Sequence, residues 1–233
     1  MTRALAIAVL SISLEASASP AQAAPILFGP TPYLSSADIP VGFFSGPFLL
    51  ENFEDNSLDF GITASGSGTS ILGPSIVTDS VDADDGVIDG SGLNGHSFLA
   101  DGNPGVTFTF SGPLPTAAAL VWTDGASFDF VANDDVTFQA FGPGMASLGV
   151  WTFTFAVPDT YAGQTAEDRF LGVQDPGGIL ALRVVNPSGQ LETDHVMFGT
   201  AGSNEAVVPE PTTLTLVGLG ALMGMARRRR VRR

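Results

Sequence analysis

The fold of this chain is decided by the stretch Val106-Thr107-Phe108-Thr109-Phe110, in which apolar residues alternate with threonines. In an extended segment, successive side chains point to opposite faces, so one face of this stretch is apolar and the other is polar. The same alternation returns at residues 136–140 and 151–155. A period of two built from aromatic, β-branched and threonine residues predicts half-buried β-strands.

Further strand-like segments surround these three and are separated by turns rich in Gly, Pro, Asn and Asp. No segment of the body shows the apolar period of an amphipathic helix. Roughly ten short strands at such spacing predict an all-β fold, an antiparallel β-sandwich of the jelly-roll type. The additional strands are expected at 48–55, 58–64, 71–78, 120–123, 169–173, 179–185 and 191–198.

These segments divide the chain into five parts. We expect a sandwich domain over residues 48–200, preceded by an extended lead-in at 24–47 and followed by a linker at 201–208. We expect targeting segments at residues 1–23 and 209–233. Within the domain, an acidic, glycine-containing stretch at 79–95 is expected to form a loop and lacks the residue spacing of an EF-hand.

The C-terminal segment combines three features in a fixed order. The first feature is an extended segment that precedes the helix and consists of Pro209, Glu210 and Pro211. It is extended because Pro211 disfavours helical backbone at Glu210. An uncharged stretch of 13 residues follows at 214–226, which as a helix would reach only about 20 Å of a bilayer core of about 30 Å. A basic cluster then ends the chain. The membrane-facing and basic positions are Leu214, Leu216, Val217, Leu219, Leu222, Arg227, Arg228, Arg229 and Arg230.

This order of features resembles the PEP-CTERM sorting signal of bacterial surface proteins. The resemblance implies recognition and cleavage by an exosortase, transient anchoring in the membrane through the C-terminal helix, and a final location at the cell envelope, the outer surface or the extracellular matrix. Because the apolar stretch is short for a membrane span, we expect it to be part of a sorting signal that is recognised and then removed. It is less suited to be a lasting anchor.

The N-terminus agrees with export. Arg3 supplies a positive charge, residues 4–14 are mostly apolar, and Ala21-Gln22-Ala23 fits the small-residue cleavage rule. We therefore predict a signal peptide over residues 1–23 and passage through the Sec machinery.

Without the two targeting segments, the body is strongly acidic. Of the 24 acidic residues in the chain, 22 remain, against two basic residues, Arg169 and Arg183. Such a charge excludes nucleic acid as a partner, because affinity for nucleic acid comes from neutralising phosphates. The chain has no cysteine, so a hydrophobic core must stabilise it in place of disulfides.

Parts of the body also resemble galactose-binding-like and carbohydrate-binding jelly rolls, namely the strand at 50–55 and the segment that begins at Asp194. In such folds acids on the first and last strands hold a structural calcium ion, which here implies Glu51, Glu54 and Asp194 as ligands.

Strand phase gives this calcium hypothesis separate support. Asp194 shares phase with Val196 and Phe198, and Glu51 shares phase with Phe53, so both carboxylates are expected to turn toward the core. A partly buried carboxylate needs a partner, and Ca²⁺ prefers oxygen ligands. The alternatives are that both acids lie in water at the sheet margin, or that an arginine pairs with one of them.

Catalytic candidates are sparse. The chain has two histidines and no G-x-S-x-G motif. His96 opens a strand and reads as structural, while His195 is out of phase with its apolar neighbours and is expected to face solvent or a neighbouring loop. No acidic pair stands among aromatic residues as a glycosidase would need. We therefore predict that the protein is not an enzyme.

Sugar binding by aromatic stacking has one exposed candidate. Tyr161 follows Pro158-Asp159 in a predicted loop, whereas Trp122 and Trp151 share phase with apolar residues and are expected in the core. Two functions remain: an exported, non-enzymatic cell-surface or extracellular-matrix protein, or a carbohydrate-binding module that acts on self-produced exopolysaccharide.

Overall fold

The computed structural model describes residues 23–75, 78–83, 95–125, 134–155, 168–187 and 189–203. The predicted sorting segment at 209–233 and Tyr161 lie outside these residues, as does the predicted signal peptide except for its last residue. In the part of the chain that the structure describes, none of the helices has the length and apolar character of a membrane span.

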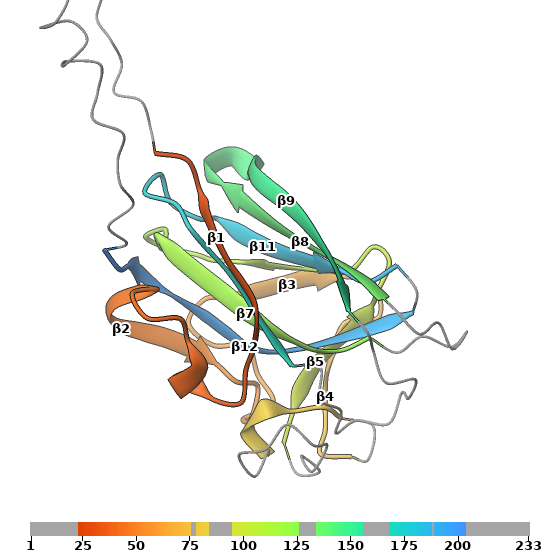
Figure 1. The fold of residues 1–233 in the computed structure, drawn as a ribbon. Coiled ribbons are helices and arrows are strands. Elements are labelled where there is room, and N and C mark those ends of the chain that lie inside the picture. The colour runs from red at the N-terminus through yellow and green to blue at the C-terminus, as the bar shows by residue number, and fades with distance from the viewer. Residues whose placement is uncertain are drawn as a thin grey trace, which may run out of the picture.

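The described residues form twelve strands and three short 3-10 helices, and every strand pair is antiparallel. The predicted all-β sandwich is therefore confirmed (Figure 1). The strands are β1 (Ile26–Pro32), β2 (Phe44–Glu51), β3 (Thr63–Gly66), β4 (Ser70–Leu72), β5 (Ser97–Asp101), β6 (Val106–Thr109), β7 (Ala117–Asp124), β8 (Asp134–Gly142), β9 (Ala146–Phe155), β10 (Arg169–Gln174), β11 (Ala181–Val185) and β12 (Gln190–Ala201). The helices are η1 (Ser36–Asp38), η2 (Val81–Ala83) and η3 (Pro143–Met145).

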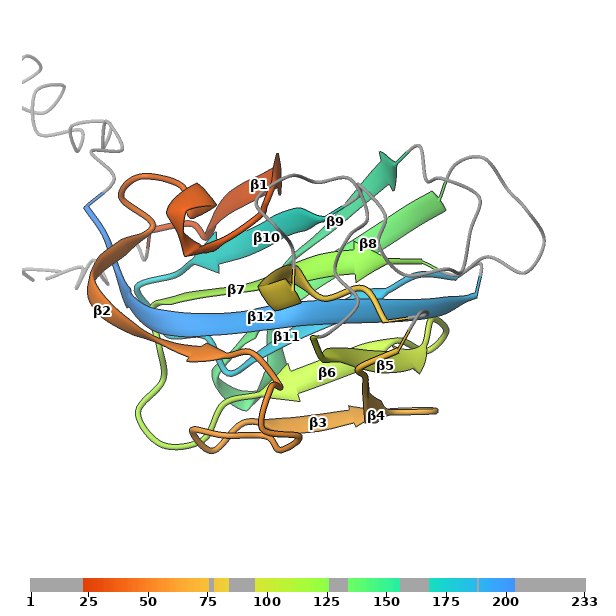
Figure 2. The same cartoon turned by 90° about the horizontal axis from the view of Figure 1, so that it is seen from below.

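The strands form two layers, a seven-stranded and a five-stranded sheet. The larger sheet has the order β1-β10-β7-β12-β5-β4, and the smaller one has the order β3-β6-β11-β8-β9. Strand β12 runs through the middle of the larger sheet, with β7 along one side and both β5 and β2 along the other (Figure 2). This long central strand carries three buried ionisable side chains, Glu192, Asp194 and His195.

Two apolar clusters stabilise the fold. The main core lies between the sheets and includes Trp122, Phe108 and Phe138, all fully buried. A second cluster covers the outer face of the larger sheet and includes Tyr33, Phe43 and Phe170. Both Tyr33 and Phe43 come from the segment predicted as a lead-in, and β1 pairs with β10, so this segment is an integral part of the sandwich.

Candidate functional site

The most unusual feature of β12 is a β-bulge. Asp194 pairs with Val121 of β7 and Met197 pairs with Ala119, so His195 and Val196 together oppose the single residue between them. His195 adopts a φ of 45°, a left-handed conformation that is uncommon outside glycine. A bulge of this kind changes which face of the sheet each flanking side chain reaches.

The bulge makes the predicted phase of Asp194 wrong. Its partner Val121 belongs to the outer apolar cluster, while Val196 and Phe198 belong to the core between the sheets. Residues paired directly across two strands share a face, so Asp194 lies on the outer face of the larger sheet. The rule that every second residue of a strand shares a face does not hold across the bulge, because the bulge at His195 adds one residue to the strand.

Asp194 is fully buried beneath the segment 79–82. One carboxylate oxygen accepts hydrogen bonds from the Val81 amide at 3.0 Å and the Ser80 hydroxyl at 3.2 Å, and the other accepts from the His195 amide at 2.6 Å. Burial raises the pKa of Asp194 to about 7, against the lowering effect of the nearby His195 charge. Asp194 thus binds a loop to the sheet.

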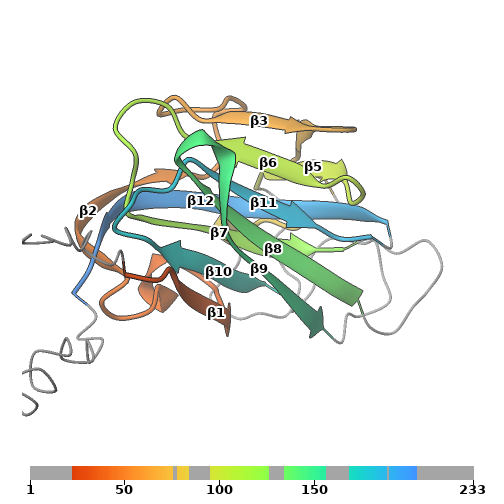
Figure 3. The same cartoon turned by 90° about the horizontal axis from the view of Figure 1, so that it is seen from above.

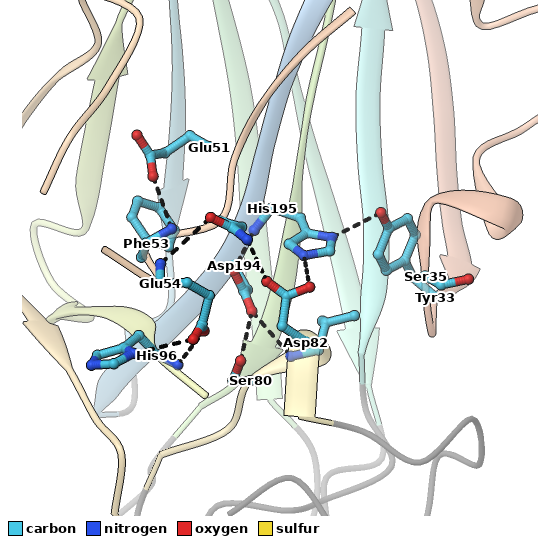
Figure 4. A network of polar contacts seen from close by, with 12 residues as sticks. Tyr33, Ser35, Glu51, Phe53, Glu54, Ser80, Asp82, His96, Asp194 and His195 are labelled. Atoms are coloured by element: carbon cyan, nitrogen blue, oxygen red, sulfur yellow. Dashed lines mark hydrogen bonds and ion pairs between the residues drawn. The ribbon is translucent and has the colours of Figure 1, made fainter. Parts of the chain in front are cut away.

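His195 is also buried, so of its two predicted surroundings, solvent or a neighbouring loop, the first is wrong. Its Nδ1 lies 2.9 Å from the Tyr33 hydroxyl, and its Nε2 lies 2.9 Å from Asp82 of η2 (Figure 4). The side-chain amide of Asn52 donates to the other oxygen of Asp82 at 2.8 Å. The contact with Asp82 does agree with the predicted alternative of a neighbouring loop.

The charges around this histidine favour its protonated form. Burial acts to lower the pKa of His195, but the charges of Asp194 and Asp82 outweigh it and raise that pKa above its ordinary value. Burial acts to raise the pKa of Asp82, but the hydrogen bond from His195 outweighs it and lowers that pKa. Burial also raises the pKa of Tyr33, so its hydroxyl stays protonated.

A second buried carboxylate lies on the same strand. One oxygen of Glu192 accepts from the Asp79 amide at 3.0 Å and from the Ser97 hydroxyl at 2.6 Å. Burial raises the pKa of Glu192 to about 7. Glu192 and Asp194 therefore hold the two ends of the same short segment. The sequence did not predict this role of Glu192.

The predicted calcium ligands do not form one site. Glu51 is buried and accepts hydrogen bonds from the backbone amides of Phe53 and Asp59, whereas Glu54 accepts from the His96 amide at 2.6 Å. Glu51 pairs with core-facing Val196, so it lies on the opposite face of the sheet from Asp194. Within the described ranges, no group of three or more His, Asp or Glu side chains is placed to hold a metal ion. Calcium binding itself stays a prediction.

The chemistry of this polar network is structural. Its members join the N-terminal segment, the turn after β2, the segment 79–82 and the bulge of β12, which lie far apart in the sequence. Tyr33 has no exposed surface and His195 is 3% exposed, so a substrate could not reach the central histidine without movement of the chain. The network holds the segment 79–82 against the sheet.

An open apolar pocket of about 550 Å³ lies elsewhere, where β2 and β12 pass the segment between β6 and β7. Two of its side chains are notably exposed, Phe60 at 48% and Leu49 at 43%. The sequence did not predict this pocket, although the prolines at 47, 113 and 115 indicate an irregular wall. The lining residues are Pro47, Phe48, Leu49, Phe60, Ser111, Pro113, Leu114, Pro115, Thr116, Phe198, Gly199 and Thr200.

The two tryptophans take the predicted place. Trp122 is fully buried, and Trp151 is partly buried and stacks on Phe138 with ring centroids 5.9 Å apart. Trp122 therefore has no surface on which a sugar could stack from outside.

Comparison with known proteins identifies the tail. Residues 207–230 match the PEP-CTERM protein-sorting motif. No curated protein matches the chain. Among solved structures, the chain is similar to the CBM22-1 and GH10 modules of endo-1,4-β-D-xylanase 10B from Clostridium thermocellum in complex with xylohexaose, with 11% identity and a TM-score of 0.33. That alignment covers 68% of this chain and 29% of the xylanase chain. The protein therefore carries a PEP-CTERM sorting motif, which marks it as an exported protein that an exosortase sorts and that its C-terminus anchors at the cell envelope.

Proposed function

We propose that this chain is a non-enzymatic protein of the cell surface or extracellular matrix, whose β-sandwich is delivered by its sorting motif. The observation that carries the proposal is the position of the motif. It begins at residue 207, six residues after the end of β12 at Ala201. A linker this short spans about 20 Å when fully extended, so the sandwich stays close to the membrane while the tail is embedded.

The state of the buried ionisable groups supports the non-enzymatic part of the proposal. Glu51, Glu192 and Asp194 each accept hydrogen bonds from backbone amides, and His195 is held between Tyr33 and Asp82. Buried side chains whose hydrogen bonds are all made within the protein stabilise the fold. A general acid or base needs a position within reach of a substrate.

In the proposed sequence of events, the signal peptide at 1–23 directs the chain to the Sec machinery. The apolar stretch then holds the chain in the membrane with its arginines on the cytoplasmic side, in line with the positive-inside rule. An exosortase processes the chain at Pro209-Glu210-Pro211 and releases the sandwich to the outer surface.

Two variants of the full gene test this proposal in the producing cell. Deletion of residues 209–233 should shift the body from the cell envelope to the medium. Replacement of Pro209, Glu210 and Pro211 by alanine should leave uncleaved chain in the membrane fraction. The matched control replaces Thr212 and Thr213 by alanine and should behave as wild type. Unchanged envelope retention after the deletion would exclude sorting by the tail.

The open pocket favours a second candidate function, binding of self-produced exopolysaccharide. Phe60 lines the pocket and is half exposed, and aromatic faces exposed beside hydroxyl groups suit sugar rings. Retention of the protein by its own polysaccharide should fall with Phe60→Ala or Tyr161→Ala but not with Val41→Ala, which removes an exposed apolar side chain outside the pocket. The same assay with EDTA tests the predicted calcium. Equal retention of all variants would reject this candidate.

A further inference from the structure

Strand β9 is the last strand of the five-stranded sheet among the described residues. Within the described residues it pairs only with β8 (Figure 3). It is ten residues long and contains neither a charged residue nor a proline. The outer backbone amides and carbonyls of an edge strand are a template for pairing with another strand.

The other described edges carry the usual protections against such pairing. Strands β3 and β4 are only four and three residues long. Strand β1 contains two prolines and has a bulge between Phe28 and Thr31. Strand β2, which lies along half of β12, contains Pro47. Short length, proline and bulges are the devices by which proteins block edge-to-edge pairing. Strand β9 has only an early bulge at Leu148, after which residues 149–155 pair regularly with β8.

The two faces of β9 suit a continued sheet. Trp151 and Phe153 are partly buried and pack on the core between the sheets. On the outer face, Val150 is 55% exposed, and Thr152 and Thr154 are also exposed. β-Branched and aromatic residues are those that stabilise cross-strand pairs, at about 0.2–1 kcal/mol for each pair.

The uncharged sequence of β9 makes a second copy of this chain a suitable partner. No residue from 136 to 158 is charged, although the body as a whole holds 22 acidic residues and two basic ones. Two copies of so acidic a protein repel one another over most of their surface. They can approach at the edge of β9 without placing carboxylates in contact.

We propose that β9 pairs antiparallel with β9 of a second copy, so that two five-stranded sheets become one continuous sheet across a two-fold axis. A two-fold interface brings the same patch of both copies together. With the axis at Thr152, this threonine faces its own counterpart, and Trp151 faces Phe153 of the second copy. Strand β12, which leads to the sorting tail, lies in the other sheet. The chain therefore does not continue into the tail from the strand that forms the proposed interface.

Sedimentation velocity of the purified full chain over a range of concentrations tests this proposal. The wild-type chain should form a dimer. Val150→Lys should weaken the association about tenfold or more, because the two-fold axis makes each substitution act twice. Ser65→Lys places the same charge on an exposed position of β3, the opposite edge of the same sheet, and should dimerise as wild type. Thermal melting of each variant confirms that it is folded.

Disulfide trapping gives an independent readout, since the chain has no cysteine of its own. Directly opposed residues in antiparallel strands have Cα atoms about 4.5–5.5 Å apart, which suits a disulfide bond. Thr152→Cys should therefore cross-link to a dimer under mild oxidation, and Ser65→Cys should not. A monomeric wild-type chain, or a dimer that persists unchanged in Val150→Lys, would overturn the proposal, and the second result would locate the contact in the tail or on another face.

Discussion

Replacement of Glu192 by glutamine should make the stability of this protein less sensitive to pH. One oxygen of the Glu192 carboxylate accepts both of its hydrogen bonds, from the Asp79 amide and the Ser97 hydroxyl. The carbonyl oxygen of glutamine can accept the same two bonds with the same side-chain length. Glu192→Gln therefore removes the ionisation and keeps the contacts.

The sign and size of the effect follow from the pKa of Glu192. Burial raises this pKa to about 7 in the folded protein, against an ordinary value of 4.5. A raised folded pKa gives stability that is complete below the unfolded pKa and is lost as pH rises through the folded pKa. Between pH 5 and pH 8 this group alone should lower the free energy of unfolding by about 2–3 kcal/mol. The glutamine variant should lie within about 1 kcal/mol of wild type at pH 5 and exceed it by about 3 kcal/mol at pH 8.

Urea unfolding followed by tryptophan fluorescence measures this difference, because Trp122 is buried in the core and reports its exposure. The full chain and the variant are compared at pH 5 and pH 8 in the same salt. A variant that is destabilised equally at both pH values would refute the argument, because it would show that the ionisation of Glu192 carries no cost in the fold.

Three further changes probe the same region by thermal or urea unfolding. Asp194→Asn should destabilise by about 1–3 kcal/mol even at pH 5, because both carboxylate oxygens accept hydrogen bonds and an amide nitrogen cannot; a neutral effect would contradict the described contacts. Tyr33→Phe should cost about 1–2 kcal/mol, since it leaves His195 Nδ1 buried without its partner, and an unchanged midpoint would indicate that water replaces the hydroxyl. Gly172→Ala should cost about 1–3 kcal/mol, because the added methyl group would lie 2.7 Å from the Phe43 ring, and wild-type stability would mean that the ring can move.

Most of the fold could be predicted from residue patterns. The alternation at 106–110, 136–140 and 151–155 located β6, β8 and β9, because a half-buried strand must place every second residue against the core. The weaker patterns were less accurate. The strand expected at 48–55 begins at Phe44 and ends at Glu51, and the one expected at 71–78 ends at Leu72. Strand β1 was missed, because its glycine and prolines hide the alternation.

The polar network could be predicted only in part. Glu51 was expected to turn inward and does so, but its partners are two backbone amides of the following turn. Asp194 was expected on the core side and lies on the other face. The error came from a single inserted residue, and a β-bulge leaves little mark on a sequence unless glycine occupies it.

The sequence by itself determined the class of the fold and the destination of the protein, because both depend on local order along the chain. Strand alternation is a property of neighbours, and the PEP-CTERM motif at 207–230 is a contiguous signal. Only the tertiary structure decided which acids are buried together, which face of the sheet Asp194 reaches and that Tyr33 contacts His195 from 162 residues away. It also decided that β9 lies at the edge of its sheet among the described residues. These facts depend on strand order and register, which are set by the packing of distant segments and not by any one stretch of the chain.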